Sequence, residues 1–124
     1  MHTRQSGLSL VELVVVVAAL AILAAIIVPR YAASRATAQE DTARATAASL
    51  LTAVSAFYMS NGCYPREVGT GQMPAGLAPY TGGQWPADFD YEQRSNDIGV
   101  AWRPGGSLRW TVWLTQGVPV QICP

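Results

Sequence analysis

Leu8–Val28 reads LSLVELVVVVAALAILAAIIV, a run of 21 residues that is apolar except for Ser9 and Glu12. A helix rising 1.5 Å per residue would span about 31 Å over this run, which matches a hydrocarbon core of about 30 Å. A carboxylate at bilayer depth costs about 2.5–3.5 kcal/mol on insertion scales. No Lys, Arg or His lies within the run to pair with Glu12. We therefore predict a membrane-spanning helix whose acid finds its partner elsewhere, in an assembly.

The segment before this run is a short polar leader, Met1–Gly7, which contains Arg4. A basic leader before an apolar stretch is also typical of a secretory signal peptide. The run is too long for the usual apolar region of such a signal, contains an acid, and is followed by Pro29-Arg30-Tyr31, a poor context for cleavage. These features favour a single-pass anchor, with Arg4 on the cytoplasmic side and the rest of the chain outside.

The composition excludes several classes of function. The chain has 124 residues, enough for one small domain beside the N-terminal element, and its net charge is zero with 13% charged residues. All basic residues are Arg, and they are too sparse for an electrostatic nucleic-acid interface. The only His is His2 in the leader, and no common nucleotide, zinc or hydrolase motif is present. The sequence predicts no enzyme, no cofactor and no metal site.

The junction between leader and apolar run carries a recognisable motif. The residues Gln5-Ser6-Gly7-Leu8-Ser9-Leu10-Val11-Glu12-Leu13 resemble the class III signal of type IV pilins and of the pseudopilins of type II secretion. The resemblance implies that a prepilin peptidase and N-methyltransferase cuts between Gly7 and Leu8 on the cytoplasmic face and methylates Leu8. Glu12 would then be the fifth mature residue. The usual first mature residue is Phe, so Leu8 departs from the family pattern.

Cleavage would supply the partner that Glu12 lacks. It creates an α-amino group on Leu8, one helical turn from Glu12, which could pair within its own chain or with a neighbouring subunit. Losing one member of a buried ion pair costs about 3–5 kcal/mol, so such a pair would fix the axial register of a filament, the role that the resemblance implies. The alternative is a Glu12 that reaches the membrane edge. Pro29 and Tyr31 also match the positions of a helix-kinking Pro and a nearby Tyr in this family.

The helical pattern continues beyond the apolar run. Residues 31–60 are rich in Ala and contain no Gly or Pro, and apolar residues recur at spacings of 4, 3, 4 and 3 at Ala43, Ala47, Leu50, Val54 and Phe57. This spacing predicts an amphipathic helix that ends before Asn61-Gly62. The whole helix would extend from Leu8 to about Ser60, with a kink or local melting near Pro29.

The remainder of the chain predicts a small sheet. Residues 61–97 are rich in Gly, Pro and Asn and are expected to be loop; Asn61–Pro65 resembles the Asn-Gly-x-Tyr-Pro stretch that follows the long helix in pilins and pseudopilins. Strands are expected at Ile98–Trp102 and Leu108–Leu114, and Val118–Ile122 is expected to be an edge strand or a short extended tail. In the second strand Leu108, Trp110, Val112 and Leu114 would face the helix and Trp113 the outside, where it could contact a neighbouring subunit.

The predicted fold is therefore α+β: a long N-terminal helix packed on a small antiparallel β-meander, as in pilins. The expected organisation is a leader at 1–7, removed on maturation, and a transmembrane or filament-core helix at 8–30. A globular domain follows at 31–124, made of the amphipathic helix half (31–60), the loop region (61–97) and the meander (98–124).

Cys63 and Cys123 form one possible pair. Beside a membrane-targeting segment they indicate a disulfide formed outside the cytoplasm, although two buried free thiols are the alternative. Closing a loop of about 60 residues would stabilise a small domain by about 4 kcal/mol on the chain-entropy model.

Acidic residues gather at Asp88, Asp90, Glu92 and Asp97, within the expected loop. Major pseudopilins bind calcium in a C-terminal loop, but the Asp-x-Asp-x-Glu spacing here lacks the Gly of a sharp calcium-binding turn. The preferred interpretation is a solvated acidic loop.

We predict a structural subunit of a type IV pilus-like filament that polymerises through its N-terminal helix, for motility, adhesion or DNA uptake. A pseudopilin of a type II secretion system is one alternative, and a single-pass membrane protein with a small exported binding domain is another. The expected partners are other pilin subunits, the peptidase, an inner-membrane assembly platform and, before assembly, membrane lipid. The expected location is the bacterial inner membrane and then the cell surface, or the periplasm for a pseudopilus.

Overall fold

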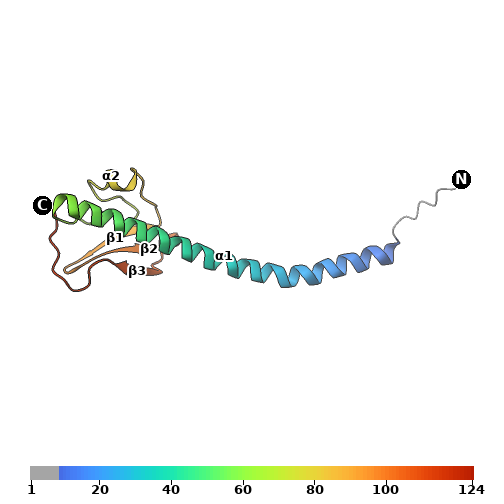
Figure 1. Ribbon diagram of the computed structural model, residues 1–124. Coiled ribbons are helices and arrows are strands. Elements are labelled where there is room, and N and C mark those ends of the chain that lie inside the picture. Colours follow the sequence, from blue (N-terminus) through green and yellow to red (C-terminus); the bar gives the residue numbers. More distant parts are fainter. Residues whose placement is uncertain (1–8) are drawn as a thin grey trace. The chain divides into compact units, whose positions relative to one another are not determined.

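The computed structural model describes residues 9–124 (Figure 1); the expected cleavage site at Gly7 and Leu8 lies outside the described residues. The elements are α1 (Leu10–Asn61), α2 (Ala78–Thr81), β1 (Phe89–Arg94), β2 (Asp97–Trp102), the 3-10 turn η1 (Pro104–Gly106) and β3 (Trp110–Trp113). The chain divides into two compact units, one ending at Glu40 and one beginning at Asp41. The fold is the predicted α+β arrangement of a long N-terminal helix and a small antiparallel sheet.

The described part of the first unit is the N-terminal portion of α1. Its large apolar side chains between Leu10 and Val28 are exposed. Within residues 9–124, α1 is the one helix that is long and apolar enough to cross a membrane, by length and composition. α1 is helical through Pro29, so the local melting considered above is not observed. Because Pro29 has no amide hydrogen, the carbonyl of Ala25 loses its usual intrahelical donor.

The second unit packs the C-terminal portion of α1 on the sheet. All five residues of the predicted apolar stripe are buried, and Leu51 and Ala53 are buried with them. They contribute to two core clusters. The first contains Ala43, Ala47, Leu50, Leu51, Phe89 and Val100. The second contains Val54, Phe57, Leu77, Tyr91 and Ile98.

The sheet has the order β1-β2-β3, and both strand pairs are antiparallel. β1 was not predicted, because residues 61–97 were expected to be loop; this expectation is wrong for Phe89–Arg94. The strand alternates with period two: Phe89 and Tyr91 enter the core, and Asp90 and Glu92 lie on the opposite face. Because Asp90 and Glu92 are charged, the sequence of this strand resembles that of a solvent-exposed loop.

The second strand of the predicted meander is shorter than expected. β3 covers Trp110–Trp113, and Trp110, Val112 and Leu114 pack against the core as predicted. Leu108 does not, since 52% of it is exposed where the chain leaves η1. Residues 118–122 form an extended tail rather than a strand of this sheet, and Ile122 makes an isolated parallel bridge with Tyr64.

Candidate assembly site

The described chain begins at the N-terminal end of α1, where Ser9 and Glu12 form a capping box. The amide of Glu12 donates to Ser9 Oγ at 3.2 Å, and the amide of Ser9 donates to Glu12 Oε2 at 3.4 Å. The first backbone bond of the helix, from Leu13 to the carbonyl of Ser9, is 3.1 Å long. In a capping box, both side chains satisfy amide donors that a helix start leaves without intrahelical acceptors.

This arrangement was missed at the sequence level, although its signal is present. Ser-x-x-Glu before an apolar run is the pattern of a capping box. Glu12 was considered only as a buried charge, whereas its carboxylate has a local backbone donor in its own chain. Its predicted partner, the amine of Leu8, lies outside the described residues, so that ion pair stays a prediction.

The surface available for assembly is the apolar part of α1. Glu12 and the side chains that follow it as far as Val28 are exposed along the helix. A contiguous apolar surface of this extent requires lipid or other helices around it. The residues that could provide assembly contacts therefore form a continuous surface on one element, beginning at the capping box.

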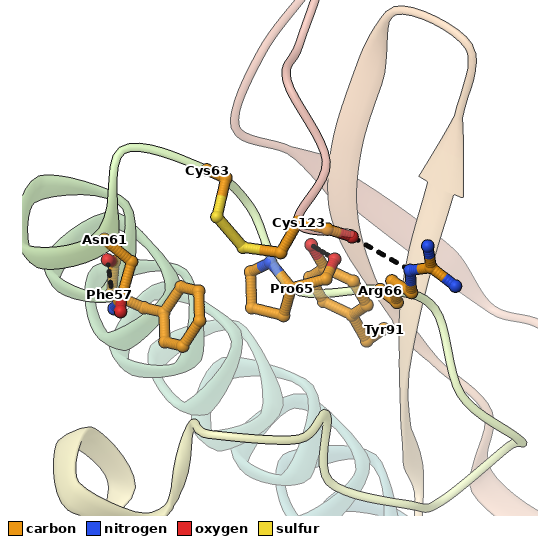
Figure 2. Close-up of a disulfide and its surroundings, with 7 residues drawn as sticks. All are labelled: Phe57, Asn61, Cys63, Pro65, Arg66, Tyr91 and Cys123. Carbon is orange, nitrogen blue, oxygen red and sulfur yellow. Dashed lines mark hydrogen bonds between the residues drawn. A yellow bond between two sulfur atoms is a disulfide. The ribbon is translucent and has the colours of Figure 1, made fainter.

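The second unit is closed by the disulfide between Cys63 and Cys123, which confirms the predicted pair (Figure 2). Their Cα atoms are 5.1 Å apart. Beside the disulfide, the amide of Tyr64 donates to Gln121 O at 2.8 Å, and the amide of Cys123 donates to Tyr64 O at 2.9 Å. Arg66 Nε donates to Cys123 O at 2.9 Å. The tail is thus joined to the segment that follows α1 by covalent and backbone contacts.

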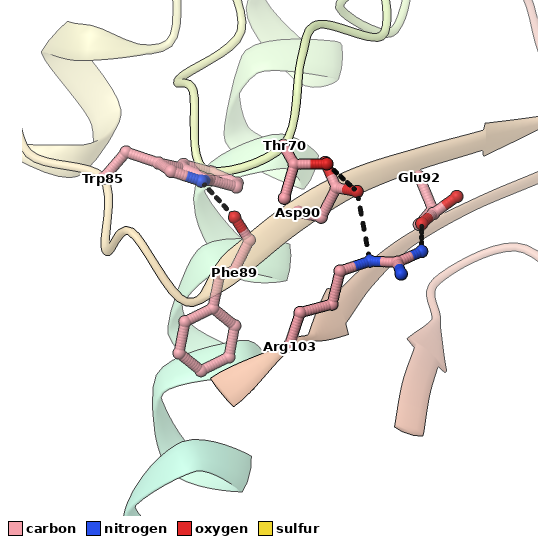
Figure 3. A network of polar contacts seen from close by, with 6 residues as sticks. All are labelled: Thr70, Trp85, Phe89, Asp90, Glu92 and Arg103. Atoms are coloured by element: carbon pink, nitrogen blue, oxygen red, sulfur yellow. Dashed lines mark hydrogen bonds and ion pairs between the residues drawn. The ribbon is translucent and has the colours of Figure 1, made fainter. Parts of the chain in front are cut away.

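The acidic residues do not form the solvated loop that was expected. Asp90 and Glu92 lie on β1, and Asp90 is only 6% exposed. Arg103 lies between them (Figure 3): its Nε is 3.3 Å from Asp90 Oδ2, and its Nη2 donates to Glu92 Oε1 at 2.8 Å. Thr70 Oγ1 also donates to Asp90 Oδ2, at 3.3 Å. Thus one guanidinium bridges the central pair of acids and offsets one of their two negative charges.

Burial is the largest cause that raises the pKa of Asp90 above its ordinary value, and the charge of Glu92 adds to it. The hydrogen bond from Thr70 and the charge of Arg103 act in the opposite direction. Among residues 9–124, no group of three or more acidic, His or Cys side chains is placed to hold a metal ion. The contacts of Asp90 with Thr70 and Arg103 join the loop containing Thr70 to the sheet.

Trp110 packs inward, as predicted, and Trp102 packs beside it. Trp102 and Trp110 are partly buried, pack on the first core cluster and lie 5.4 Å apart between ring centroids. Arg44 of α1 covers the Trp110 ring at 4.9 Å. Trp85 is held by a hydrogen bond of 3.0 Å from its Nε1 to Phe89 O (Figure 3). Core packing therefore accounts for Trp85, Trp102 and Trp110.

Comparison with known proteins identifies the N-terminal motif. Residues 2–28 match the family described as the prokaryotic N-terminal methylation motif. The chain is 37% identical over 78 residues, 63% of its length, to the type IV major pilin protein PilE1 of Neisseria gonorrhoeae. It is also 37% identical over 67 residues, 54% of its length, to the type IV major pilin protein PilE of the same organism.

The match covers part of each relative: 34% of the first and 40% of the second. No solved structure matches the chain significantly. The chain carries the prokaryotic N-terminal methylation motif of the class III prepilin signal and is related in sequence to type IV major pilins.

Proposed function

We propose that this chain is a structural subunit of a type IV pilus-like filament and that it has no catalytic role. The observation that carries the proposal is the N-terminal methylation motif at residues 2–28, which leads into an exposed apolar helix. A processing signal alone would fit many exported proteins. Here the signal is followed by an apolar surface that needs lipid or other helices around it. This combination favours a protein that is first inserted in the membrane and then assembled into a filament.

Assembly would exchange lipid contacts of the apolar run for helix–helix contacts. Lipid tails are as apolar as Leu, so the net gain comes from close packing and from polar groups that find partners. Glu12 is the acidic residue of this apolar surface, which extends from Leu10 to Val28. It would pair with the amine that cleavage after Gly7 creates. Pro29 would relax the helix beyond the apolar run during packing. The sheet and the disulfide of the second unit would form the part of the subunit outside the filament core.

The partners and location follow from this mechanism. A prepilin peptidase and N-methyltransferase would process the precursor in the bacterial inner membrane, with lipid around the apolar helix. An inner-membrane platform would then add the subunit to a homopolymer at the cell surface. The organisation would be a leader at 1–7, a filament-core helix at 8–30 and a globular domain at 31–124.

N-terminal mass analysis of the mature protein tests the processing. We expect a chain that begins at methylated Leu8. A mature chain that retains Met1, or that begins near Ala32–Ser34, would contradict the proposal.

A charge substitution tests the assembly. Glu12→Gln keeps the shape of the side chain and removes its charge, so we expect processed chains that stay in the membrane and a large loss of sheared filaments. The matched control is Asp41→Asn, which removes an exposed acid from α1 outside the apolar run. A plain membrane anchor would tolerate both changes equally, and that result would favour an exported binding domain instead.

A pseudopilin of a type II secretion system remains the second candidate, since its subunits share the same signal. The relatives named above are pilins, which favours the extended filament. Analysis of sheared surface fibres separates the two functions. If the chain is their main component, the pseudopilin function is excluded; if fibres lack it while secretion depends on it, the pilus function is excluded.

A further inference from the structure

We propose that a cleft between α1 and the segment that begins at α2 binds a neutral saccharide. Tyr80 and Trp85 would contact the apolar face of the sugar ring, and Gln84 would hydrogen-bond its hydroxyl groups. The cleft lies within the second unit. The inference goes beyond the filament function proposed above and does not rest on it, because it uses no residue of the leader or of the apolar part of α1.

The cleft has the size of a site for a small molecule, with a volume of about 510 Å³. Such sites are usually clefts of about 300–1,000 Å³ that are mostly apolar, with a few polar groups that fix the orientation of the ligand. Here α1 and the segment that begins at α2 both contribute apolar and neutral polar side chains, among them Ser49, Leu50, Ala53, Tyr80, Gln84 and Trp85.

The two rings of the cleft are held in place by contacts of the folded chain. Trp85 Nε1 donates to Phe89 O at 3.0 Å (Figure 3). The ring of Tyr80 packs edge-on against Phe57, with 5.9 Å between the ring centroids. Core packing leaves both Tyr80 and Trp85 partly exposed. Ordering of side chains is a main cost of binding, and rings that are already held reduce this cost.

The cleft also has hydrogen-bonding capacity that the folded chain does not use. Among residues 9–124, neither the Tyr80 hydroxyl nor the Gln84 amide has a hydrogen-bond partner. Ser49 Oγ donates to Ala45 O at 3.1 Å, which leaves its lone pairs able to accept a hydrogen bond. An amide and a phenol both donate and accept, so the cleft suits a ligand with several hydroxyl groups.

The lining also selects the class of ligand by its charge. Of the described residues that line the cleft, none is acidic or basic. A charged ligand would lose hydration on entering and gain no counter-charge. A wholly apolar ligand would cover the polar groups of Tyr80 and Gln84 without pairing them, which also costs free energy. A pyranose ring has an apolar C–H face and a rim of hydroxyl groups, so a neutral saccharide matches both kinds of lining.

Saturation-transfer NMR on the full chain in lipid nanodiscs tests the binding. The probes are the methyl glycosides of glucose, galactose, mannose, N-acetylglucosamine and N-acetylgalactosamine, with N-acetylneuraminic acid as the charged comparison. We expect at least one neutral glycoside to bind with a Kd on the order of 1 mM, because a ligand of this size gains a limited free energy per atom. Absence of saturation by every neutral glycoside, or equal binding of the acid, would overturn the proposal.

Substitutions of polar groups locate the binding site. Gln84→Ala and Tyr80→Phe each remove one hydrogen-bonding group and keep both rings, so we expect each to weaken binding about 3- to 10-fold. The matched controls are Gln116→Ala, which removes an exposed amide outside the cleft, and Tyr58→Phe, which removes an exposed phenol hydroxyl of α1. Binding that is unchanged in both cleft variants would exclude the cleft as the site.

A steric variant distinguishes blocked binding from lost folding. Ser49→Phe places a ring in the cleft from an exposed position of α1, so we expect loss of glycoside binding with an unchanged Tm. Thr52→Phe is the control, because Thr52 is exposed on the same helix and does not line the cleft. Glycoside binding that persists in Ser49→Phe would contradict the proposal.

A second copy of the chain is the competing occupant of the cleft. If Ser49→Phe abolished filaments while the natural chain bound no glycoside, the cleft would be a contact between subunits and the saccharide proposal would be wrong. That result would leave the proposed filament function intact. Retention of Met1 in the mature chain would instead refute the processing and leave saccharide binding unaffected.

Discussion

Trp113 lies over Gly99 on the outer face of the sheet. The two residues are register partners of β3 and β2, and an added Cβ at Gly99 would lie 2.7 Å from Trp113 Cε3 and 2.7 Å from Val112 O. Arg94 covers the indole at 4.9 Å from its centroid. The indole therefore lies against the bare backbone of a buried glycine. Trp113 is on the outer face, as predicted, and its contact with a neighbouring subunit stays a prediction.

We expect Gly99→Ala to lower the free energy of unfolding. A contact of 2.7 Å with both an indole and a backbone oxygen cannot be accommodated without moving a strand. Overpacking of this kind costs about 1–3 kcal/mol. Thermal unfolding of the chain in bilayers, followed by Trp fluorescence, measures the loss, because all four Trp residues lie in the second unit.

The control for this change is Gly69→Ala. Gly69 does not have a positive φ, and an added Cβ there would meet only the flexible side chain of Gln72. We expect a much smaller effect at Gly69 than at Gly99. Equal effects at the two sites would show that the fit of Trp113 over Gly99 is not the cause.

The long helix and the disulfide could be predicted because their signals are local or few. The stripe from Ala43 to Phe57 repeats at the helical period, and two cysteines allow one pair. β1 was missed because Asp90 and Glu92 alternate with Phe89 and Tyr91, and the acids resembled a solvated loop. Their pairing with a cation depends on Arg103, which reaches them only through the register of β1 against β2. Local patterns do not contain that register.

The N-terminal site was predicted in part. The sequence predicts Glu12 as the acid of the assembly surface and the bond after Gly7 as the cleavage site, and both stay predictions. It did not yield the role of Ser9, since an apolar run was interpreted through membrane depth rather than through helix capping. The contact between Ser9 and Glu12 is nevertheless local, because the two residues are three positions apart at the start of α1.

Asp90→Asn should change how stability depends on pH. Burial raises the pKa of Asp90, so the folded state holds the proton more tightly than the unfolded state does. The contribution of this carboxyl to stability is full below its ordinary pKa of 3.8 and is lost as pH rises through the raised value. We therefore expect the free energy of unfolding of the natural chain, minus that of Asp90→Asn, to fall as pH rises through this window.

Urea unfolding at several pH values measures that difference. Asp88→Asn is the control, because Asp88 is exposed and precedes the strand. A difference that stays flat would show that the charge of Arg103 cancels the effect of burial on the pKa of Asp90, and one that rises with pH would show that it outweighs burial.

Tyr91→Phe should destabilise the second unit by removing one buried hydrogen bond. The hydroxyl of Tyr91 donates to Pro65 O at 2.9 Å, and both residues are fully buried (Figure 2). The variant leaves this carbonyl without its donor, which costs about 1–3 kcal/mol. Tyr58→Phe is the control, since Tyr58 is exposed and its stacking on Tyr64 needs only the ring. Equal losses in the two variants would argue against the buried bond.

The same residue gives an alkaline signature. Burial is the first cause that raises the pKa of Tyr91 above its ordinary value of 10.0. Its stabilising contribution is therefore present below that value and is lost only as pH rises through the higher folded value. In an ultraviolet titration of the folded chain we expect Tyr91 to ionise after the exposed tyrosines. Tyr91→Phe should remove that last step; a last step that persists would belong to another tyrosine.

Loss of the disulfide should be the most destabilising of these changes. Cys63 and Cys123 are 60 positions apart and enclose all three strands. Reducing the disulfide raises the conformational entropy of the unfolded chain and so lowers the free energy of unfolding by about 4 kcal/mol. The tail would then depend on the bridge between Tyr64 and Ile122 and on the bond from Arg66. We expect a lower Tm for the natural chain in reductant and for the double variant Cys63→Ser/Cys123→Ser in its absence. Because the double variant has no disulfide to reduce, its Tm should not respond to reductant. If reductant lowered the Tm of both proteins equally, the disulfide would not be the cause.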